Sequence, residues 1–151
     1  MAGGGNYILN KGYQVLATYN SSAAAGVTRY RAVKLTVVSS AIRLDINATA
    51  ATASIGVVQE DIDAAKVAYG NAVANVALVG ITKMYVTTGT SIVIGSKIMV
   101  GGSGATAGGA VLAATTGNAV VGICVGMSVP GGTVAAGDLI DVLLTPGLLV
   151  P

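Results

Sequence analysis

Histidine, phenylalanine and tryptophan are absent from this chain of 151 residues, and cysteine occurs once. Without histidine, the usual proton-transfer group near neutral pH is missing, and a single cysteine excludes a disulfide within the chain. Cys124 stands between Ile123 and Val125, where a cysteine usually behaves as a small buried hydrophobic residue. A catalytic thiol would need a histidine to activate it. We therefore expect no enzyme, no cofactor, no metal and no small-molecule substrate.

Charged side chains are also scarce, at 9% of the residues, whereas ordinary soluble domains have about 25%. A mixed charged surface normally keeps a domain soluble, so we expect other chains to cover much of this surface. Closed symmetry is the usual solution, which predicts a homo-oligomer, and we expect a trimer. The alternative is a soluble monomer whose surface is made of Ser, Thr, Asn and Gly.

Long unbroken hydrophobic runs are missing as well. No charge occurs between Lys97 and Asp138, but GGSGATAGG, TTGN and VPGG interrupt this stretch. No run therefore approaches the roughly 18 apolar residues of a spanning helix. The beginning, MAGGGNYILNKG, lacks the basic start and the hydrophobic stretch of a signal peptide. We expect a protein that is neither membrane-bound nor secreted by that route.

The residues that are abundant favour β-structure. Hydrophobic residues make up 53% of the chain and are mostly Val, Ala, Ile and Leu, which suit the pleated surface of a sheet. RYRAVKLTVV and AIRLDIN alternate apolar and polar residues, the period of a half-buried strand. Further β-rich segments follow, separated by glycine-containing turns. The sequence predicts an all-β domain over residues 31–151, a small sandwich or barrel.

One segment, QEDIDAAKVAYGN, could form a short helix, which Asp61 would cap and Gly70 would end. An extended loop fits this segment nearly as well. Its acids, Glu60, Asp61 and Asp63, lack the ligand spacing of a calcium loop, and we interpret them as solvated turn residues.

A doubled pattern links the two halves of the predicted β-domain. Ile55-Gly56-Val57 matches Val121-Gly122-Ile123 at an offset of 66, and each is followed by an excursion, a Gly-polar turn and an apolar strand. Two copies are too few for a solenoid, which needs about three. They fit a sandwich or barrel built from two similar β-units. The inner glycine of each copy predicts a bulge or a close backbone approach where a side chain would not fit.

Residues 1–30 have no sustained period, and we predict that they form an extended N-terminal arm. YILNKGYQVLATY could form one or two short strands around a tight turn at Asn10-Lys11-Gly12. Tyrosine combines apolar area with a hydrogen-bonding tip and is enriched at interfaces. Basic residues gather in the first 45 positions against one acid, which suggests an acidic partner, protein or nucleic acid, or else a solvated sheet face. The candidate partner-binding residues are Tyr7, Tyr13, Tyr19, Arg29 and Arg31.

Two segments partly match patterns of nucleotide-binding or nucleic-acid-binding proteins. GSGATA satisfies G-x-G-x-x-A, but neither a helix nor an acid about 20 residues later follows it, so we interpret it as a flexible hairpin loop. TRYRAVK could stack on single strands through Tyr30. Its basic patch is small and the sequence pI of about 8.8 is below the value above 9 typical of nucleic-acid modules. We expect no nucleic acid as a partner.

From about Leu35 onward the chain resembles a family of small capsid decoration (cement) proteins of tailed bacteriophages. The order of several short segments over roughly 100 residues carries the resemblance. At Gly95-Ser96-Lys97-Ile98 the chain departs from the Gly-Asp-x-Val turn that is common in that family. Residues 1–30 lie outside the resemblance. The segments are SIGVVQEDIDA, VALVGITKMYV, IVIGSKIMVGGSGA, TGNAVVGICVG and AGDLIDVLL.

The resemblance implies a structural protein made in the host cytoplasm that binds the outside of the mature capsid, often as a trimer. Such proteins contact the major capsid protein and strengthen the shell against internal DNA pressure. The arm could then add a strand to an exposed sheet edge of the capsid protein or of a sister subunit. The main alternative is a β-rich receptor- or carbohydrate-binding module on a virion or cell surface. That module would usually expose more aromatic residues than this chain has beyond Tyr30.

Overall fold

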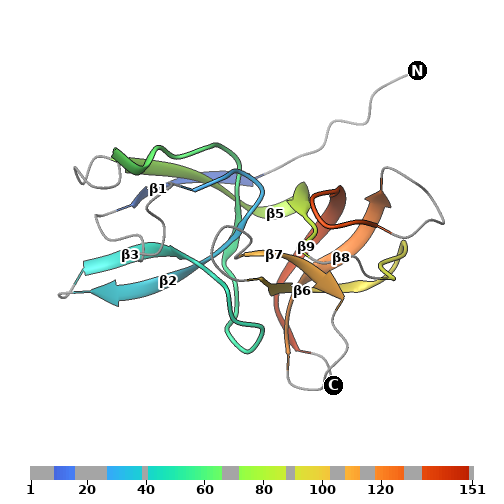
Figure 1. Ribbon diagram of the computed structural model, residues 1–151. Helices are drawn as coiled ribbons and strands as arrows, with labels where there is room; N and C mark the ends of the chain where they lie inside the picture. Colours follow the sequence, from blue (N-terminus) through green and yellow to red (C-terminus); the bar gives the residue numbers. More distant parts are fainter. Residues whose placement is uncertain are drawn as a thin grey trace.

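The computed structural model describes residues 9–15, 27–38, 41–65, 72–87, 91–102, 108–112, 118–127 and 134–149. These residues form nine β-strands (Figure 1). The strands are β1 (Leu9–Val15), β2 (Ala32–Val38), β3 (Ala41–Ile46), β4 (Gly56–Val58), β5 (Ala72–Tyr85), β6 (Lys97–Gly101), β7 (Gly109–Leu112), β8 (Ala119–Met127) and β9 (Leu139–Leu149). The predicted all-β class is confirmed.

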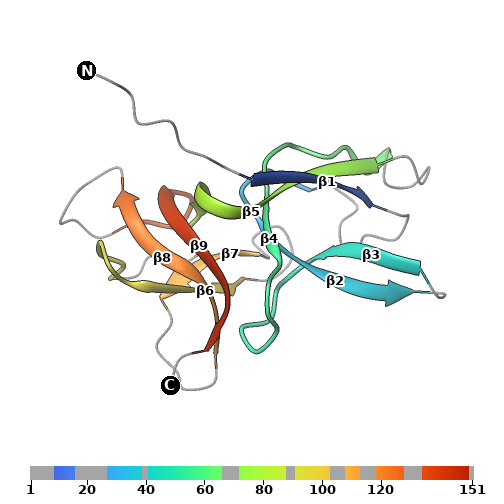
Figure 2. The ribbon, with the colours of Figure 1, turned by 180° about the vertical axis from the view of Figure 1, so that it is seen from behind.

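All the strands belong to one antiparallel sheet, whose order is β3-β2-β4-β5-β9-β8-β6-β7, with β1 paired to β5 beside this path. The order reads the same from both ends if β2, β3, β4 and β5 are exchanged for β6, β7, β8 and β9. We call these two sets the first unit and the second unit. Figures 1 and 2 show them as two lobes on either side of the junction between β5 and β9.

The long strand β5 connects the two units. Its first half pairs with β1 and β4, and its second half, from Gly80 to Tyr85, pairs with β9. Gly80 has a positive φ of 102°, which glycine adopts without steric cost. Beyond β5, Val86 forms a parallel bridge with Ala110 of β7. This bridge brings the far edge of the second unit back to β5, so that the sheet curls toward a barrel.

The two units repeat the same register, which confirms the predicted pair of similar β-units. The repeat extends beyond the two glycine motifs, because β2 and β3 match β6 and β7 as well. The offset is 65 for β2 and 66 for β3, β4 and β5. The matched pairs are Val57–Ala77 with Ile123–Leu143, Val58–Val76 with Cys124–Val142, Val33–Gly56 with Ile98–Gly122, and Val33–Ile46 with Ile98–Leu112.

The repeated glycines have the close backbone approach that the sequence predicts. A Cβ atom on Gly56 would overlap the carbonyl oxygen of Ala77 and would lie 2.8 Å from Val76 Cγ1. A Cβ atom on Gly122 would overlap the carbonyl oxygen of Leu143 and would lie 2.6 Å from Val142 Cγ1. The backbone of the neighbouring strand therefore approaches Gly56 and Gly122 equally closely, and only glycine fits at these two positions.

Buried side chains form two clusters, one for each unit. The first-unit cluster contains Val27, Val33, Leu44, Val58, Ile62, Ala74 and Val76. The second-unit cluster contains Val86, Ile92, Ile98, Val100, Ala110, Val121, Cys124, Val134, Ile140, Val142 and Leu144, and four first-unit residues, Ala32, Val57, Ala77 and Met84, complete it. The two units therefore share a packed junction.

Two local predictions differ from the structure. Asn10, Lys11 and Gly12 are not a turn: they lie within β1, because each pairs with a residue of β5. Asp61 does not cap the predicted helix. Instead, Asp63 Oδ1 accepts a hydrogen bond from the Ala65 backbone N–H, the contact that an N-cap residue makes. Ala64 and Ala65 are helical, and the rest of that segment, 66–71, lies outside the described residues.

The predicted arm, residues 1–30, is described in part. Its strand β1 adds to the sheet along β5 over seven residues, and its Val27 is buried and bridges to Ile62. The boundary between an arm and a domain over residues 31–151 stays a prediction. Within the described part of the chain, no helix is long and apolar enough to cross a membrane.

Candidate binding surface at the junction of the two units

Two arginines and two tyrosines meet where the start of β2 lies beside the end of β5. Arg29, Tyr30 and Arg31 precede β2, and Tyr85 is the last residue of β5. The backbone holds them in place, because the Tyr30 N–H donates to the Val58 carbonyl oxygen over 2.7 Å. The Arg29 N–H donates to Asp61 Oδ1 over 2.8 Å. We call these four residues the arginine–tyrosine cluster.

Within the cluster, the two tyrosine rings lie next to each other and each ring has an arginine over it. Arg29 Cζ lies 5.2 Å from the centre of the Tyr30 ring, and Arg31 Cζ lies 4.8 Å from the centre of the Tyr85 ring. The two rings are 6.0 Å apart with an interplanar angle of 53°. Both arginines are within the 6 Å or so over which a cation is attracted to a ring face. The order is therefore Arg29, Tyr30, Tyr85, Arg31.

Tyr30 has a backbone conformation that normally requires glycine. Its φ is +66°, and it is the one non-glycine residue with positive φ among the described residues. The repeat matches it to Gly95, whose φ is +91°. Both N–H groups make the matching hydrogen bond, from Tyr30 to Val58 O and from Gly95 to Cys124 O. A side chain in this conformation costs about 1 kcal/mol, and such residues cluster at functional sites.

Arg31 is half-buried at the junction, with its Nη1 atom 2.8 Å from where a Cβ on Gly109 would lie. Glycine at position 109 therefore leaves room for the guanidinium. Burial lowers the pKa of Arg31 and the nearby Tyr85 acts in the opposite direction, but an arginine stays charged at physiological pH. The cluster carries two permanent positive charges, and guanidinium groups bind carboxylates and phosphates well.

Several of the described acidic residues have structural partners. Glu60 Oε1 accepts hydrogen bonds from the backbone and side-chain amides of Asn75. Asp138 Oδ2 accepts from the Ala135 N–H, and Asp141 forms an exposed ion pair with Lys83 at 3.0 Å. Among the described residues, no three His, Cys, Asp or Glu side chains lie close enough to hold a metal ion. These acids stabilise turns and a strand pair.

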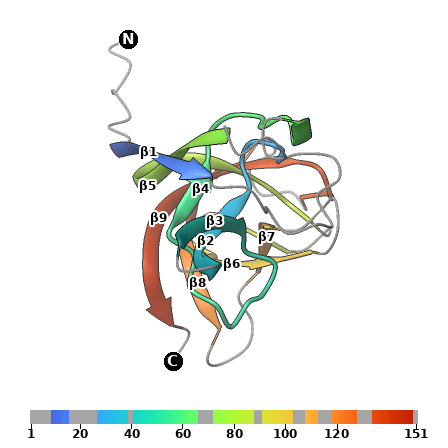
Figure 3. The same ribbon diagram turned by 90° about the vertical axis from the view of Figure 1, so that its left-hand side faces the viewer.

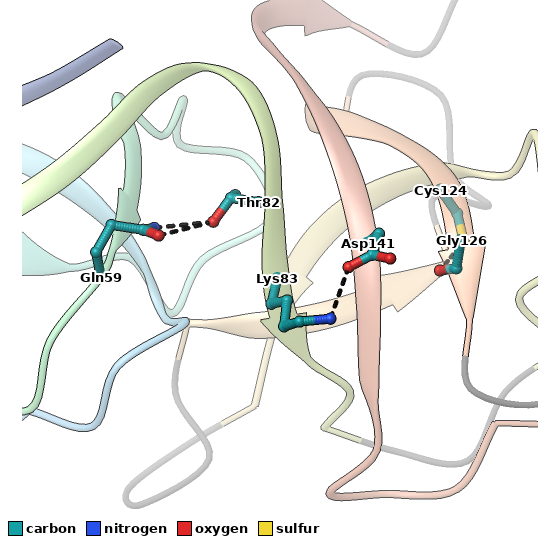
Figure 4. A network of polar contacts seen from close by, with 6 residues as sticks. All are labelled: Gln59, Thr82, Lys83, Cys124, Gly126 and Asp141. Atoms are coloured by element: carbon teal, nitrogen blue, oxygen red, sulfur yellow. Dashed lines mark hydrogen bonds and ion pairs between the residues drawn. The ribbon is translucent and has the colours of Figure 1, made fainter. Parts of the chain in front are cut away.

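Cys124 is fully buried in the second-unit core, and its Sγ donates to the Gly126 carbonyl oxygen over 3.5 Å (Figure 4). Burial raises the pKa of the thiol, and the negative charge of Asp141 raises it further. A thiolate, the reactive form, is therefore disfavoured. The prediction of a buried cysteine is confirmed.

The candidate residues from the sequence fall into two groups. Arg29 and Arg31 lie together in the arginine–tyrosine cluster. Tyr13 lies on β1, opposite Ala74, and Tyr7 and Tyr19 lie outside the described residues. Tyr30 and Tyr85 were missing from the candidate set. The repeat offers a signal for Tyr30, because an offset of 65 places it opposite Gly95.

With the fold described, known structures can be compared with it. The N base of the head fiber gp8.5 of bacteriophage phi29 matches with a TM-score of 0.58, covering 92% of this chain and 95% of that one. The two chains share a fold. Their sequence identity is 17%. No protein-family model and no curated protein matches this sequence. The resemblance to capsid decoration proteins therefore stays a prediction.

Proposed function

We propose that this chain is a structural virion protein of a tailed bacteriophage, a capsid decoration protein that binds the outer surface of the shell and stabilises it. Its partner is the major capsid protein, and it acts as a homo-oligomer, which we expect to be a trimer. The observation that carries the proposal is the shared fold with a phage head-fiber base over nearly the whole of both chains. Fold alone does not define function, so the surface chemistry has to agree with it.

The surface chemistry favours binding over catalysis. The arginine–tyrosine cluster combines fixed positive charge with aromatic area, the composition found at the centre of protein interfaces. Its four members are two arginines, which hold a fixed positive charge, and two tyrosines, which supply ring area and a hydrogen-bonding hydroxyl. We infer that the cluster contacts an acidic patch of the capsid protein.

A binding assay on capsids tests this proposal. Purified protein is mixed with mature capsids that lack it, sedimented, and the bound fraction is measured at low and high salt. We expect binding that weakens with salt, and a loss of binding for Arg29→Glu. Lys34→Glu is the matched control, because it makes the same change in charge on β2, outside the cluster. Wild-type protein that stays in the supernatant, or equal binding by both variants, would contradict the proposal.

The shared fold also favours a second candidate. The similar protein is the base of a head fiber, so this chain could carry a fiber or a receptor-binding part on the virion. Two assays distinguish the candidates. A decoration protein raises the temperature at which capsids release DNA, whereas a receptor-binding module binds cells or glycans. Glycan binding with no effect on capsid stability would favour the second candidate.

A further inference from the structure

One face of the sheet is buried on the first unit, and the equivalent face of the second unit is exposed. On the first unit this face consists of Ala32, Val57 and Ala77, all fully buried, and we call it the first outer face. The repeat matches these residues to Lys97, Ile123 and Leu143, the second outer face. Here Lys97 is exposed, Ile123 is half-buried and Leu143 is 38% exposed. The two faces have the same strands and register but different surroundings.

The first outer face is buried because it packs on the second unit. Its three residues belong to the second-unit core, together with Val100 of β6 and Val142 of β9. Direct contacts at the same junction support this packing. The Ala32 N–H donates to the Gly108 carbonyl oxygen over 2.7 Å. The side chains of Gln59 and Thr82 hydrogen-bond to each other and so join the end of β4 to the half of β5 that pairs with β9 (Figure 4).

Within the part of the chain that the structure describes, the β2 side of the first-unit core lacks such a cover. The repeat matches Leu35 of β2 to Val100 of β6, yet Leu35 is 43% exposed while Val100 is fully buried. Val37, two residues further along the same face of β2, is 69% exposed. We call Leu35 and Val37 the open side of the first unit; Figure 3 views the molecule from the end where β2 and β3 lie. Among the described residues, each chain thus exposes one outer face on the second unit and, beside the buried first-unit core, the open side on β2.

We propose that copies of this chain associate head to tail, with the second outer face of one copy packed on the open side of the first unit of the next. This contact repeats between copies the packing that joins the two units within one chain. Apolar side chains extend the second outer face, because Val125 is 37% exposed and Ile81 lies opposite Leu143 on β5. The Lys83–Asp141 ion pair lies beside them. An apolar centre with a charged rim is the usual composition of an interface.

The position of β1 fits this arrangement. β1 pairs with Ala72–Val79 of β5, and the repeat matches that segment to residues 138–145 of β9, which the second half of β5 covers. β1 therefore closes the strand edge that a preceding unit would otherwise close. Because β1 occupies this edge of β5, a second copy can dock on the exposed face without exchanging strands at β5. A head-to-tail contact between unlike faces closes into a ring when its rotation permits.

Size-exclusion chromatography with light scattering tests the proposal on the full-length protein. We expect the wild type to form an oligomer, and Leu143→Asp and Leu35→Asp each to give monomers. Mixing the two variants is the sharper measurement, because each retains one intact surface. We expect the mixture to form dimers that neither variant forms alone. Ile94→Asp is the control: this side chain is 59% exposed, and the repeat matches it to the exposed Arg29, so the oligomer should persist.

The folding of each variant is checked by circular dichroism. Val125→Asp and Val37→Asp replace Leu143→Asp and Leu35→Asp if either of these fails to fold. A monomeric wild type, a mixture that stays monomeric, or an oligomer that survives Leu35→Asp would overturn the proposal. The proposal concerns the self-association named in the proposed function and not the capsid. An oligomer that does not bind capsids would contradict the proposed function and not the head-to-tail contact. Capsid binding by a monomeric wild type would contradict the head-to-tail contact and not the binding to the capsid.

Discussion

Adding one methyl group at Gly56 or Gly122 should destabilise the protein by nearly the same amount at both positions. In each case the new Cβ atom would overlap a backbone carbonyl oxygen of the neighbouring strand, on Ala77 or on Leu143. Backbone atoms cannot rotate away as a side chain can. The pair of strands must therefore separate, at the cost of hydrogen bonds in the centre of each unit.

The expected magnitude follows from two opposing terms. Overpacking of a well-packed site costs up to about 3 kcal/mol. Replacing glycine by alanine restricts the unfolded chain, which returns up to about 1 kcal/mol. Neither Gly56 nor Gly122 has a positive φ, so no conformational cost is added. We expect Gly56→Ala and Gly122→Ala each to lower the free energy of unfolding by about 2 kcal/mol.

Urea denaturation followed by circular dichroism measures both variants. Gly137→Ala is the comparison, because a Cβ at Gly137 would meet no atom within 4 Å, although its φ is +94°. This variant should cost about 1 kcal/mol, the price of the left-handed conformation alone. A tolerated alanine at position 56 or 122, or a difference between the two that exceeds about 1 kcal/mol, would refute the equivalence of the two units.

Three further predictions concern the thiol, the strained tyrosine and the N-terminal segment. Cys124 should react slowly with a thiol reagent in the native state. Because folding raises the pKa of this thiol, its contribution to the free energy of unfolding should be present below the ordinary thiol pKa and be lost as pH rises through the folded value. Urea titrations at several pH values should show this pH dependence in the wild type and not in Cys124→Ala. Fast labelling of the native protein would contradict burial of the thiol. Tyr30→Gly should change the free energy of unfolding by less than about 1 kcal/mol, because relief of backbone strain offsets the lost ring contacts. The same variant should co-sediment less with capsids, and unchanged capsid binding would contradict a binding role for the arginine–tyrosine cluster. Deleting residues 2–28 removes β1 and Val27. We expect a less stable domain that keeps its β-sheet circular dichroism signal and no longer co-sediments with capsids. Loss of that signal would show that the domain cannot fold without this segment.

The fold class and the repeat could be predicted because both depend on patterns between residues that are close in the sequence. Alternation at Val33, Leu35 and Val37 marks β2, and a glycine within a β-branched run marks the crossing of two strands. The full extent of the repeat was not visible, because the offset shifts from 65 to 66 between β2 and β3. The matched residues also differ in kind, as Ala32 and Lys97 do, since one is buried at the junction and the other faces solvent.

The site was predicted in part. Arg29 and Arg31 stood out by charge, but Tyr85, the ring partner of Arg31, comes from a strand more than 50 residues later. Its backbone N–H donates to the Tyr30 carbonyl oxygen over 3.4 Å, a contact that only the folded chain makes. The turn that contains Gly95, in which the Ser96 N–H donates to the Val93 carbonyl oxygen over 2.9 Å, directly precedes β6. Asn10-Lys11-Gly12 looked like a turn, but pairing with β5 outweighs its turn propensity. Tertiary contacts decided each of these cases.

Electron cryo-microscopy of virions made from the genome that encodes this chain tests the central claim most directly. The account predicts density with this two-unit β-fold on the outer surface of the capsid, at positions that follow its symmetry, in contact with the major capsid protein. It also predicts that virions from which the gene has been deleted lack this density and release DNA at lower temperature. A capsid exterior that is the same with and without the gene would contradict the account.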